Sequence, residues 1–364
     1  MAILGLVATP AGACDEPVYQ MAMNAWRPGL FEGYLFHRGP LDAKTREAMD
    51  WLDSAAEGQP AEPANLVVRA IDVDADMAAP IAAIWRRQKS PSLPHLVVMP
   101  PLAFGVTGDR SVYAGPLDMA SAKALIDSPV RQLLARRLRS GEAIVWVLLT
   151  GPDAKQNAAA RAVLRQGCDE AVQGYIPPDA EPFDTEPFDA EPFDAEPSDI
   201  EPPDTEPPDT EPPEPIRYGI VELSRDDPGE AMLRAMLMRS EPDLQAHAGS
   251  KPVALPIFGQ GRSLTGLVFE QITRDKVLDV CEFLLGPCSC MVSEMAPGVD
   301  LLIRTDWSQP AEPVVEQAVA AGAAAQAGSS GMGAVLRNVL IALGVIAAAA
   351  VVAALVARTR PQRS

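Results

Sequence analysis

The sequence is poor in the residues that most often carry enzyme chemistry. It has only three histidines among 364 residues, His37, His95 and His247, and they are scattered, with no HExxH pair or other metal-ligand spacing. It also lacks a glycine-rich phosphate loop and a GxSxG nucleophile elbow. These absences argue against zinc hydrolases, P-loop enzymes and α/β-hydrolases, and we expect neither a metal nor a cofactor.

Basic residues are too few and too dispersed for a nucleic-acid partner. The net charge is −19, but residues 177–215 alone hold fifteen Asp and Glu and no Lys or Arg. Outside that segment, 34 acidic residues face 30 basic ones, so the rest of the chain is almost balanced. No basic patch that would track phosphates is evident, and we expect no binding to nucleic acid.

The acidic residues are concentrated in a repeat that interrupts the chain. Residues 177–215 repeat a five-residue unit, EPFDT EPFDA EPFDA EPSDI EPPDT EPPDT EPPEP. Dense prolines prevent helices and sheet ladders, and regular carboxylates repel one another, which predicts an extended, disordered spacer of up to about 120 Å. Calcium binding is the alternative, but nothing in the repeat closes an oxygen cage around an ion.

The C-terminal region predicts a membrane anchor. Residues 339–357 are nineteen positions without a charge, and as a helix they would span roughly 28 Å, the thickness of the hydrocarbon layer. We therefore expect a transmembrane helix over 334–357, preceded by an Ala/Gly-rich linker over 301–333; a buried core helix is the alternative. Arg358, Arg360 and Arg363 follow it, so the positive-inside rule predicts that the tail 358–364 is cytoplasmic.

The N-terminus is consistent with export of everything before that helix. Residues 1–13 contain a short apolar run that ends in Ala11-Gly12-Ala13, the small-x-small form of a signal-peptidase site. The segment lacks a basic start, so an N-terminal strand is an alternative. Acylation of Cys14 is another. The prediction is a single-pass protein of the cell membrane with its folded part outside the cytoplasm.

Helical and strand patterns alternate in the same order in both halves of the remaining chain. In the first half, strands are expected at 34–37, 66–73 and after Pro94, and helices at 42–56, 79–87 and 120–139. In the second half, strands are expected at 144–150, 218–223 and after Pro252, with helices to about 165, at 230–239 and at 274–285. The sequence GQGR at 259–262 predicts a hairpin turn. Four tryptophans fall in or near these elements and are best explained by core packing: Trp26, Trp51, Trp85 and Trp146.

This β-α-β-α-β-β-α order, with a proline opening the third strand, resembles the thioredoxin superfamily. The resemblance implies an α/β chain with two thioredoxin-like domains, 14–141 and 142–300, the second interrupted by the 177–215 spacer. Pro94 and Pro252 match the proline at the edge of the family's active-site groove. In the family that proline is characteristically cis, which the resemblance implies for both positions.

The residues that would carry the family's redox chemistry are missing from both halves. A working thioredoxin has Cys-x-x-Cys directly after its first strand, where the helix N-terminus favours the thiolate. The matching positions here are His37-Arg38-Gly39-Pro40 and Thr150-Gly151-Pro152-Asp153. Neither contains cysteine. An anion-binding or acid–base role for His37 is an alternative to an ordinary edge histidine.

Two of the five cysteines stand together in GPCSC, at Cys288 and Cys290, after the last predicted helix. A helix C-terminus disfavours a thiolate, so a structural tie is favoured over a redox-active Cys-x-Cys or soft-metal binding. The pair would bond within itself or to Cys281, Cys168 or Cys14, because exported cysteines tend to be oxidised. Five cysteines cannot all pair within one chain.

Two functions of different class follow from these patterns. The favoured one is a membrane-tethered, non-catalytic binding or scaffold protein of the bacterial cell envelope that holds a partner protein. The alternative is an envelope thiol–disulfide oxidoreductase with Cys288 and Cys290 as its catalytic residues.

Overall fold

The helices and strands that the computed structural model describes run from Val18 to Asp300, and the folded unit that contains them ends at Glu312. The described residues are 16–58, 62–89, 91–101, 111–175, 215–239, 244, 249–287, 292 and 298–314. The predicted signal peptide, transmembrane helix and basic tail lie outside them, as does the acidic repeat apart from Pro215. Within the described part, no helix is long and apolar enough to cross a membrane.

The fold is mixed α/β with two sheets. The first sheet has the strand order β2-β1-β3-β4, in which β1 is parallel to β2 and β3 is antiparallel to both β1 and β4. Its strands are β1 (Phe31–His37), β2 (Leu66–Asp72), β3 (His95–Met99) and β4 (Tyr113–Gly115). The helices that accompany it are α2 (Ala43–Ala56), α3 (Ala79–Arg87) and α4 (Met119–Ile126).

Strand β1 separates two apolar layers, because successive side chains of a strand point to opposite faces. Phe31 and Leu35 are fully buried in the layer that includes α2 and α4. Tyr34 and Phe36 point into the other layer, where Phe36 packs against Trp85 of α3 with ring centroids 4.9 Å apart.

The second sheet repeats the arrangement of the first around β5. Its order is β10-β8-β7-β5-β6, with β5 parallel to β6, and β7 antiparallel to β5, β8 and the short β9. The strands are β5 (Glu142–Leu149), β6 (Arg217–Leu223), β7 (Val253–Phe258), β8 (Arg262–Ser263), β9 (Leu267–Val268) and β10 (Val299–Asp300). The helices are α1 (Val18–Asn24), α5 (Pro129–Arg139), α6 (Ala154–Gly174), α7 (Ala231–Arg239) and α9 (Arg274–Leu285), with 3₁₀ turns at Pro228–Glu230 and Phe269–Gln271.

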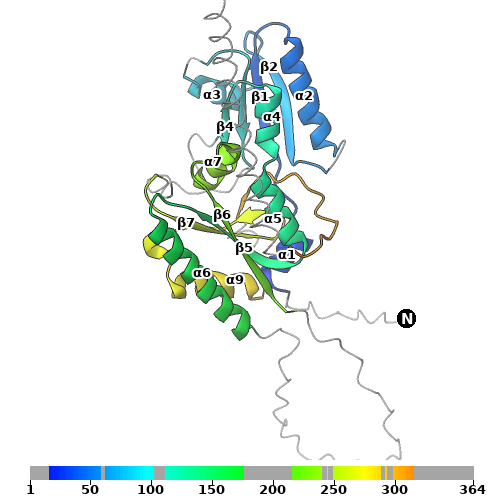
Figure 1. Ribbon diagram of the computed structural model, residues 1–364. Coiled ribbons are helices and arrows are strands. Elements are labelled where there is room, and N and C mark those ends of the chain that lie inside the picture. The colour runs from blue at the N-terminus through cyan, green and yellow to red at the C-terminus, as the bar shows by residue number, and fades with distance from the viewer. Residues whose placement is uncertain are drawn as a thin grey trace, which may run out of the picture. The chain divides into compact units, whose positions relative to one another are not determined.

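Strand β5 is buried on both faces, which explains its unbroken apolar run AIVWVLL. Trp146 faces the layer that contains α1, α6 and α9. Val145 and Val147 face the opposite layer, which contains α5 and α7. Figure 1 shows α6 and α9 side by side on one face of this sheet, with α5 on the other.

Most of the predicted elements are confirmed, but the single helix expected over 120–139 is wrong. The chain forms α4 and α5 there, separated at Asp127 and Ser128. Ser128 caps α5 by accepting a hydrogen bond from the Arg131 backbone N–H at 3.3 Å, and Pro129 occupies its first turn. A proline suits a helix start, where its missing N–H costs no hydrogen bond, but it breaks a helix interior.

Two other boundaries differ from the expected ones. Helix α6 extends to Gly174, about nine residues beyond the predicted end near 165. The segment expected as a linker from residue 301 begins as part of the folded unit, because Leu301, Leu302 and Ile303 are buried. The GQGR turn is confirmed between β7 and β8, with Gly259 and Gly261 at φ values of 53° and 78°.

Candidate functional site

The junction between β1 and α2 holds the segment His37–Pro40, the first of the two that were predicted to match a thioredoxin active site. Asp42 caps α2, accepting hydrogen bonds from the backbone N–H groups of Lys44 at 2.9 Å and Thr45 at 3.0 Å. The bond from the Thr45 N–H is the main reason that the pKa of Asp42 is lowered. A carboxylate therefore occupies the start of this helix. His37 contacts the carbonyl oxygen of Gly39 through Nδ1 at 2.7 Å, as an ordinary edge histidine would.

At the equivalent junction between β5 and α6, a carboxylate again caps the helix N-terminus. Asp153 caps α6 and accepts from the backbone N–H of Lys155 at 2.8 Å. Asn157 binds both backbone groups of Gly151, accepting from its N–H at 2.7 Å and donating to its carbonyl oxygen at 3.0 Å. A third side chain, Arg225, donates to the carbonyl oxygen of Thr150 at 2.9 Å, so side chains engage several of the backbone groups at this junction.

The two prolines predicted at the groove edge differ from each other. The Leu93–Pro94 peptide bond is cis, as expected, and it is the one cis bond among the described residues. The expectation of a cis bond before Pro252 is therefore wrong. Pro252 nevertheless lies against the β5–α6 junction, since a Cβ atom added to Gly151 would approach its Cδ to 2.9 Å.

Three of the five candidate cysteines, Cys14, Cys288 and Cys290, lie outside the described residues, so their pairing stays a prediction. The chain directly before Cys288 is well placed. Gly286 ends α9 and its carbonyl oxygen accepts the Val18 N–H at 3.0 Å. Pro287 then forms a bridge with Pro17. The start of GPCSC is thus attached to α1.

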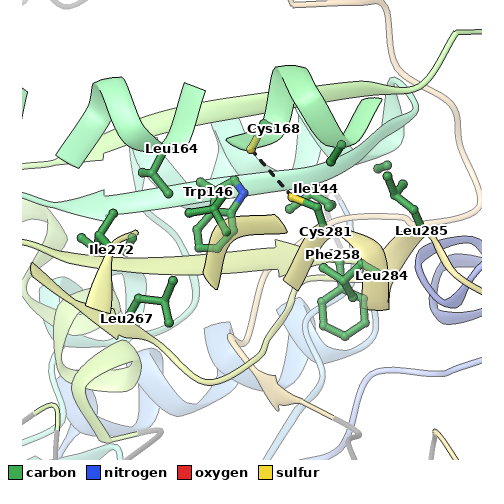
Figure 2. Close-up of a cluster of buried hydrophobic side chains, with 14 of the residues drawn as sticks. Ile144, Trp146, Leu164, Cys168, Phe258, Leu267, Ile272, Cys281, Leu284 and Leu285 are labelled. Carbon is green, nitrogen blue, oxygen red and sulfur yellow. Dashed lines mark hydrogen bonds between the residues drawn. The ribbon is translucent and has the colours of Figure 1, made fainter. Parts of the chain in front are cut away.

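The remaining two cysteines come together in the core of the second half. Cys168 of α6 and Cys281 of α9 are each 1% exposed, and their sulfur atoms lie 3.9 Å apart, in hydrogen-bonding contact (Figure 2). Both are free thiols. Pairing of either one with Cys288 or Cys290 stays a prediction, while the described structure brings Cys168 and Cys281 into contact with each other.

Trp146 of β5 forms the third member of this cluster. Its side chain is fully buried, and its indole nitrogen lies on the side of the ring nearest the two sulfur atoms (Figure 2). The indole N–H has no hydrogen-bond acceptor among the described residues. The group is thus a buried donor without a partner in a cluster of apolar side chains.

The contact between the two thiols shifts their pKa values in opposite directions. The hydrogen bond to Cys281 raises the pKa of Cys168, with burial adding to the effect. The hydrogen bond from Cys168 lowers the pKa of Cys281, against the opposing effect of burial. The indole of Trp146 favours the thiolate at both positions. The proton of Cys281 is therefore easier to remove than the proton of Cys168.

Helical spacing places each cysteine on the buried face of its own helix. In α6, Cys168 continues the buried stripe of Ala160 and Leu164 at four-residue intervals. In α9, Cys281 follows Val277 by four residues. Each cysteine lies on the apolar stripe of its helix, and both helices cover one face of the same sheet, but sequence gives no register between them.

No group of three or more His, Cys, Asp or Glu side chains within the described ranges is arranged to hold a metal ion. No known protein-family model matches the chain, and no curated protein matches it. Its function is therefore inferred from its own residues.

Proposed function

We propose that this chain is a membrane-tethered, non-catalytic binding or scaffold protein of the bacterial cell envelope, built from two thioredoxin-like halves. Support for the thioredoxin-like part comes from the topology. The orders β2-β1-β3-β4 and β6-β5-β7-β8 have the same parallel and antiparallel pairings, in a β-α-β-α-β-β-α succession that occurs twice.

One observation carries the non-catalytic part of the proposal. At both junctions where thioredoxins place their reactive thiol, the helix N-terminus is capped by a carboxylate, Asp42 or Asp153. A thiolate there would be stabilised by the free N–H groups and the positive end of the helix dipole. Those N–H groups are already engaged, and a carboxylate would repel a second negative charge.

The tether is proposed from the 334–357 segment, the arginines after it and the small-x-small site at residues 11–13. The acidic repeat between α6 and β6 fits a protein whose folded part lies outside the cytoplasm. An extended, charged segment there would either keep other macromolecules away from the domain or reach out to bind them. The partner is expected to be a protein that binds the folded halves without electron transfer.

Catalysed insulin reduction tests the proposal. The full-length chain, purified in detergent, is compared with its Cys288→Ser/Cys290→Ser variant in the presence of dithiothreitol. Neither should accelerate insulin precipitation above the uncatalysed rate. Turnover by the wild type that is lost in a folded double variant would replace this proposal with the oxidoreductase alternative.

Membrane attachment is tested separately. The full-length chain should remain in the membrane pellet after alkaline extraction, and a variant that lacks residues 334–357 should be released. In intact spheroplasts, added protease should degrade all but a small C-terminal fragment. Complete protection of the folded unit would reverse the proposed orientation.

A further inference from the structure

We propose that Cys168 and Cys281 form a buried redox site of their own, a dithiol that closes to a disulfide by exchange with a low-molecular-weight disulfide. The inference does not rest on the proposed function, because the reaction is stoichiometric and involves neither βα junction. This disulfide is also different from one formed with Cys288 or Cys290. Its two sulfur atoms lie on helices α6 and α9, which cover the same face of one sheet.

The two sulfur atoms are close enough to bond after a small movement. The sulfur atoms are 3.9 Å apart, whereas a disulfide needs about 2.05 Å, so each sulfur has to move by only about 1 Å. The two helices approach closely at this point because Gly167 precedes Cys168. A Cβ atom on Gly167 would lie 2.7 Å from Cγ1 of Val277, a distance that only the absence of a side chain permits.

The surroundings of the two sulfur atoms include one polar group, the indole N–H of Trp146. An indole N–H that is fully buried and has no hydrogen-bond acceptor is costly in an apolar core. Trp146 turns this donor toward the two sulfurs, where a thiolate would accept it (Figure 2). The same N–H therefore stabilises the negative charge that develops on sulfur during exchange.

The reaction balances with a single co-reactant. The Cys281 thiolate attacks the disulfide RSSR, forms a mixed disulfide and releases RS⁻. Cys168 then loses its proton and attacks the Cys281 sulfur, which releases the second RS⁻. The two thiolates take up the two protons, so the net change is two cysteine thiols and RSSR to one protein disulfide and two RSH.

Access to the site comes from α9 rather than from a channel. Both thiols are 1% exposed, so the small disulfide reaches them only when α9 moves away from α6. Helix α9 has its outer side in solvent, where Phe283 is 37% exposed. Its last turn is held to α1 through Gly286 and Pro287. Opening of such a surface helix is a local unfolding event that costs less than global unfolding.

The test uses the full-length chain in detergent with Cys14, Cys288 and Cys290 all replaced by serine, so that only the two core cysteines remain. The protein is equilibrated with mixtures of reduced and oxidised glutathione, quenched with acid, denatured and labelled with a maleimide that adds mass to each free thiol. The equilibrium constant for disulfide closure is measured once under native conditions and once in concentrated urea.

If the fold builds this site, the equilibrium constant for disulfide closure should be roughly a thousandfold larger under native conditions than in concentrated urea. That factor is the scale of the loop-closure entropy for cysteines 113 residues apart. A preference of tenfold or more supports the proposal. A smaller preference, or mixed glutathione disulfides without closure, overturns it. The matched control, the same protein with Cys168→Ala, should acquire only mixed disulfides, and circular dichroism of each variant confirms that it is folded.

Discussion

The close packing of α6 on α9 predicts opposite effects for the same substitution at two glycines of α6. Gly167 faces Val277, and a Cβ atom there would lie 2.7 Å from Cγ1 and 2.8 Å from Cβ of that valine. Gly174, the last residue of the helix, has nothing within 4 Å of the equivalent position. Alanine should therefore raise the free energy of unfolding at position 174 and lower it at position 167.

The magnitudes decide the sign at Gly167. Alanine gains about 0.8–1.0 kcal/mol over glycine in a helix interior. Overpacking a tight contact costs about 1–3 kcal/mol, and Val277 cannot easily rotate away, because a β-branched side chain in a helix has essentially one favoured χ1. We expect Gly167→Ala to lower the free energy of unfolding by up to about 2 kcal/mol, which is the overpacking cost less the gain in helix propensity. Gly174→Ala should raise it by about 0.4–1 kcal/mol.

Urea unfolding of residues 14–312, followed by tryptophan fluorescence, measures both effects. Adding Val277→Ala to the Gly167 variant removes the colliding methyl groups, so the two substitutions should show a favourable coupling of about 1 kcal/mol in a double-mutant cycle. The reasoning is refuted if Gly167→Ala is as stable as Gly174→Ala.

Three further predictions concern polar groups of the folded unit. Glu142→Gln should cost about 3–5 kcal/mol in urea unfolding, because it leaves the nearly buried Arg137 guanidinium, 3.0 Å away, without its charge partner, whereas replacing both residues by methionine should cost much less. Burial raises the pKa of Asp300, so the folded state holds this proton more tightly than the unfolded state. Wild-type stability should therefore fall as pH rises from about 3.9 through the raised pKa. Asp300→Asn should lack this component, and parallel stability–pH curves for the two proteins would contradict the assignment. Asp153→Ala should lower stability by about 1 kcal/mol through loss of the α6 cap, while Asp153→Ser should restore most of it.

Much of the fold follows from local patterns. The unbroken apolar run of β5 requires cover on both faces, which α6 and α9 provide on one side and α5 and α7 on the other. The glycines of GQGR predict a tight turn because glycine adopts positive φ values without strain. Residues 259 and 261 do have positive φ values in the structure. The helix break at Pro129 was missed, since α4 and α5 are both apolar on one side and the Ser128 cap signal is a single residue.

The candidate site was less accessible to sequence reasoning. The contact between Cys168 and Cys281 joins residues 113 positions apart and depends on the register of two packed helices. That register is set by the fit of Gly167 against Val277, which no periodicity reveals. The buried Asp300 was missed for the same reason, because its partners Gly29 and Asn65 come from the other half of the unit.

The central claim, that the protein holds a partner without thiol chemistry, is tested most directly by comparing the proteins that copurify with two affinity-tagged forms. One is the wild type and the other has all five cysteines replaced, Cys168 and Cys281 by alanine and the other three by serine. After detergent solubilisation, the copurifying proteins are quantified by mass spectrometry with and without dithiothreitol. The account predicts the same principal partner at similar abundance in both forms, unaffected by the reductant. A partner that is retained only by the wild type, and released by dithiothreitol from a mixed disulfide, would contradict it.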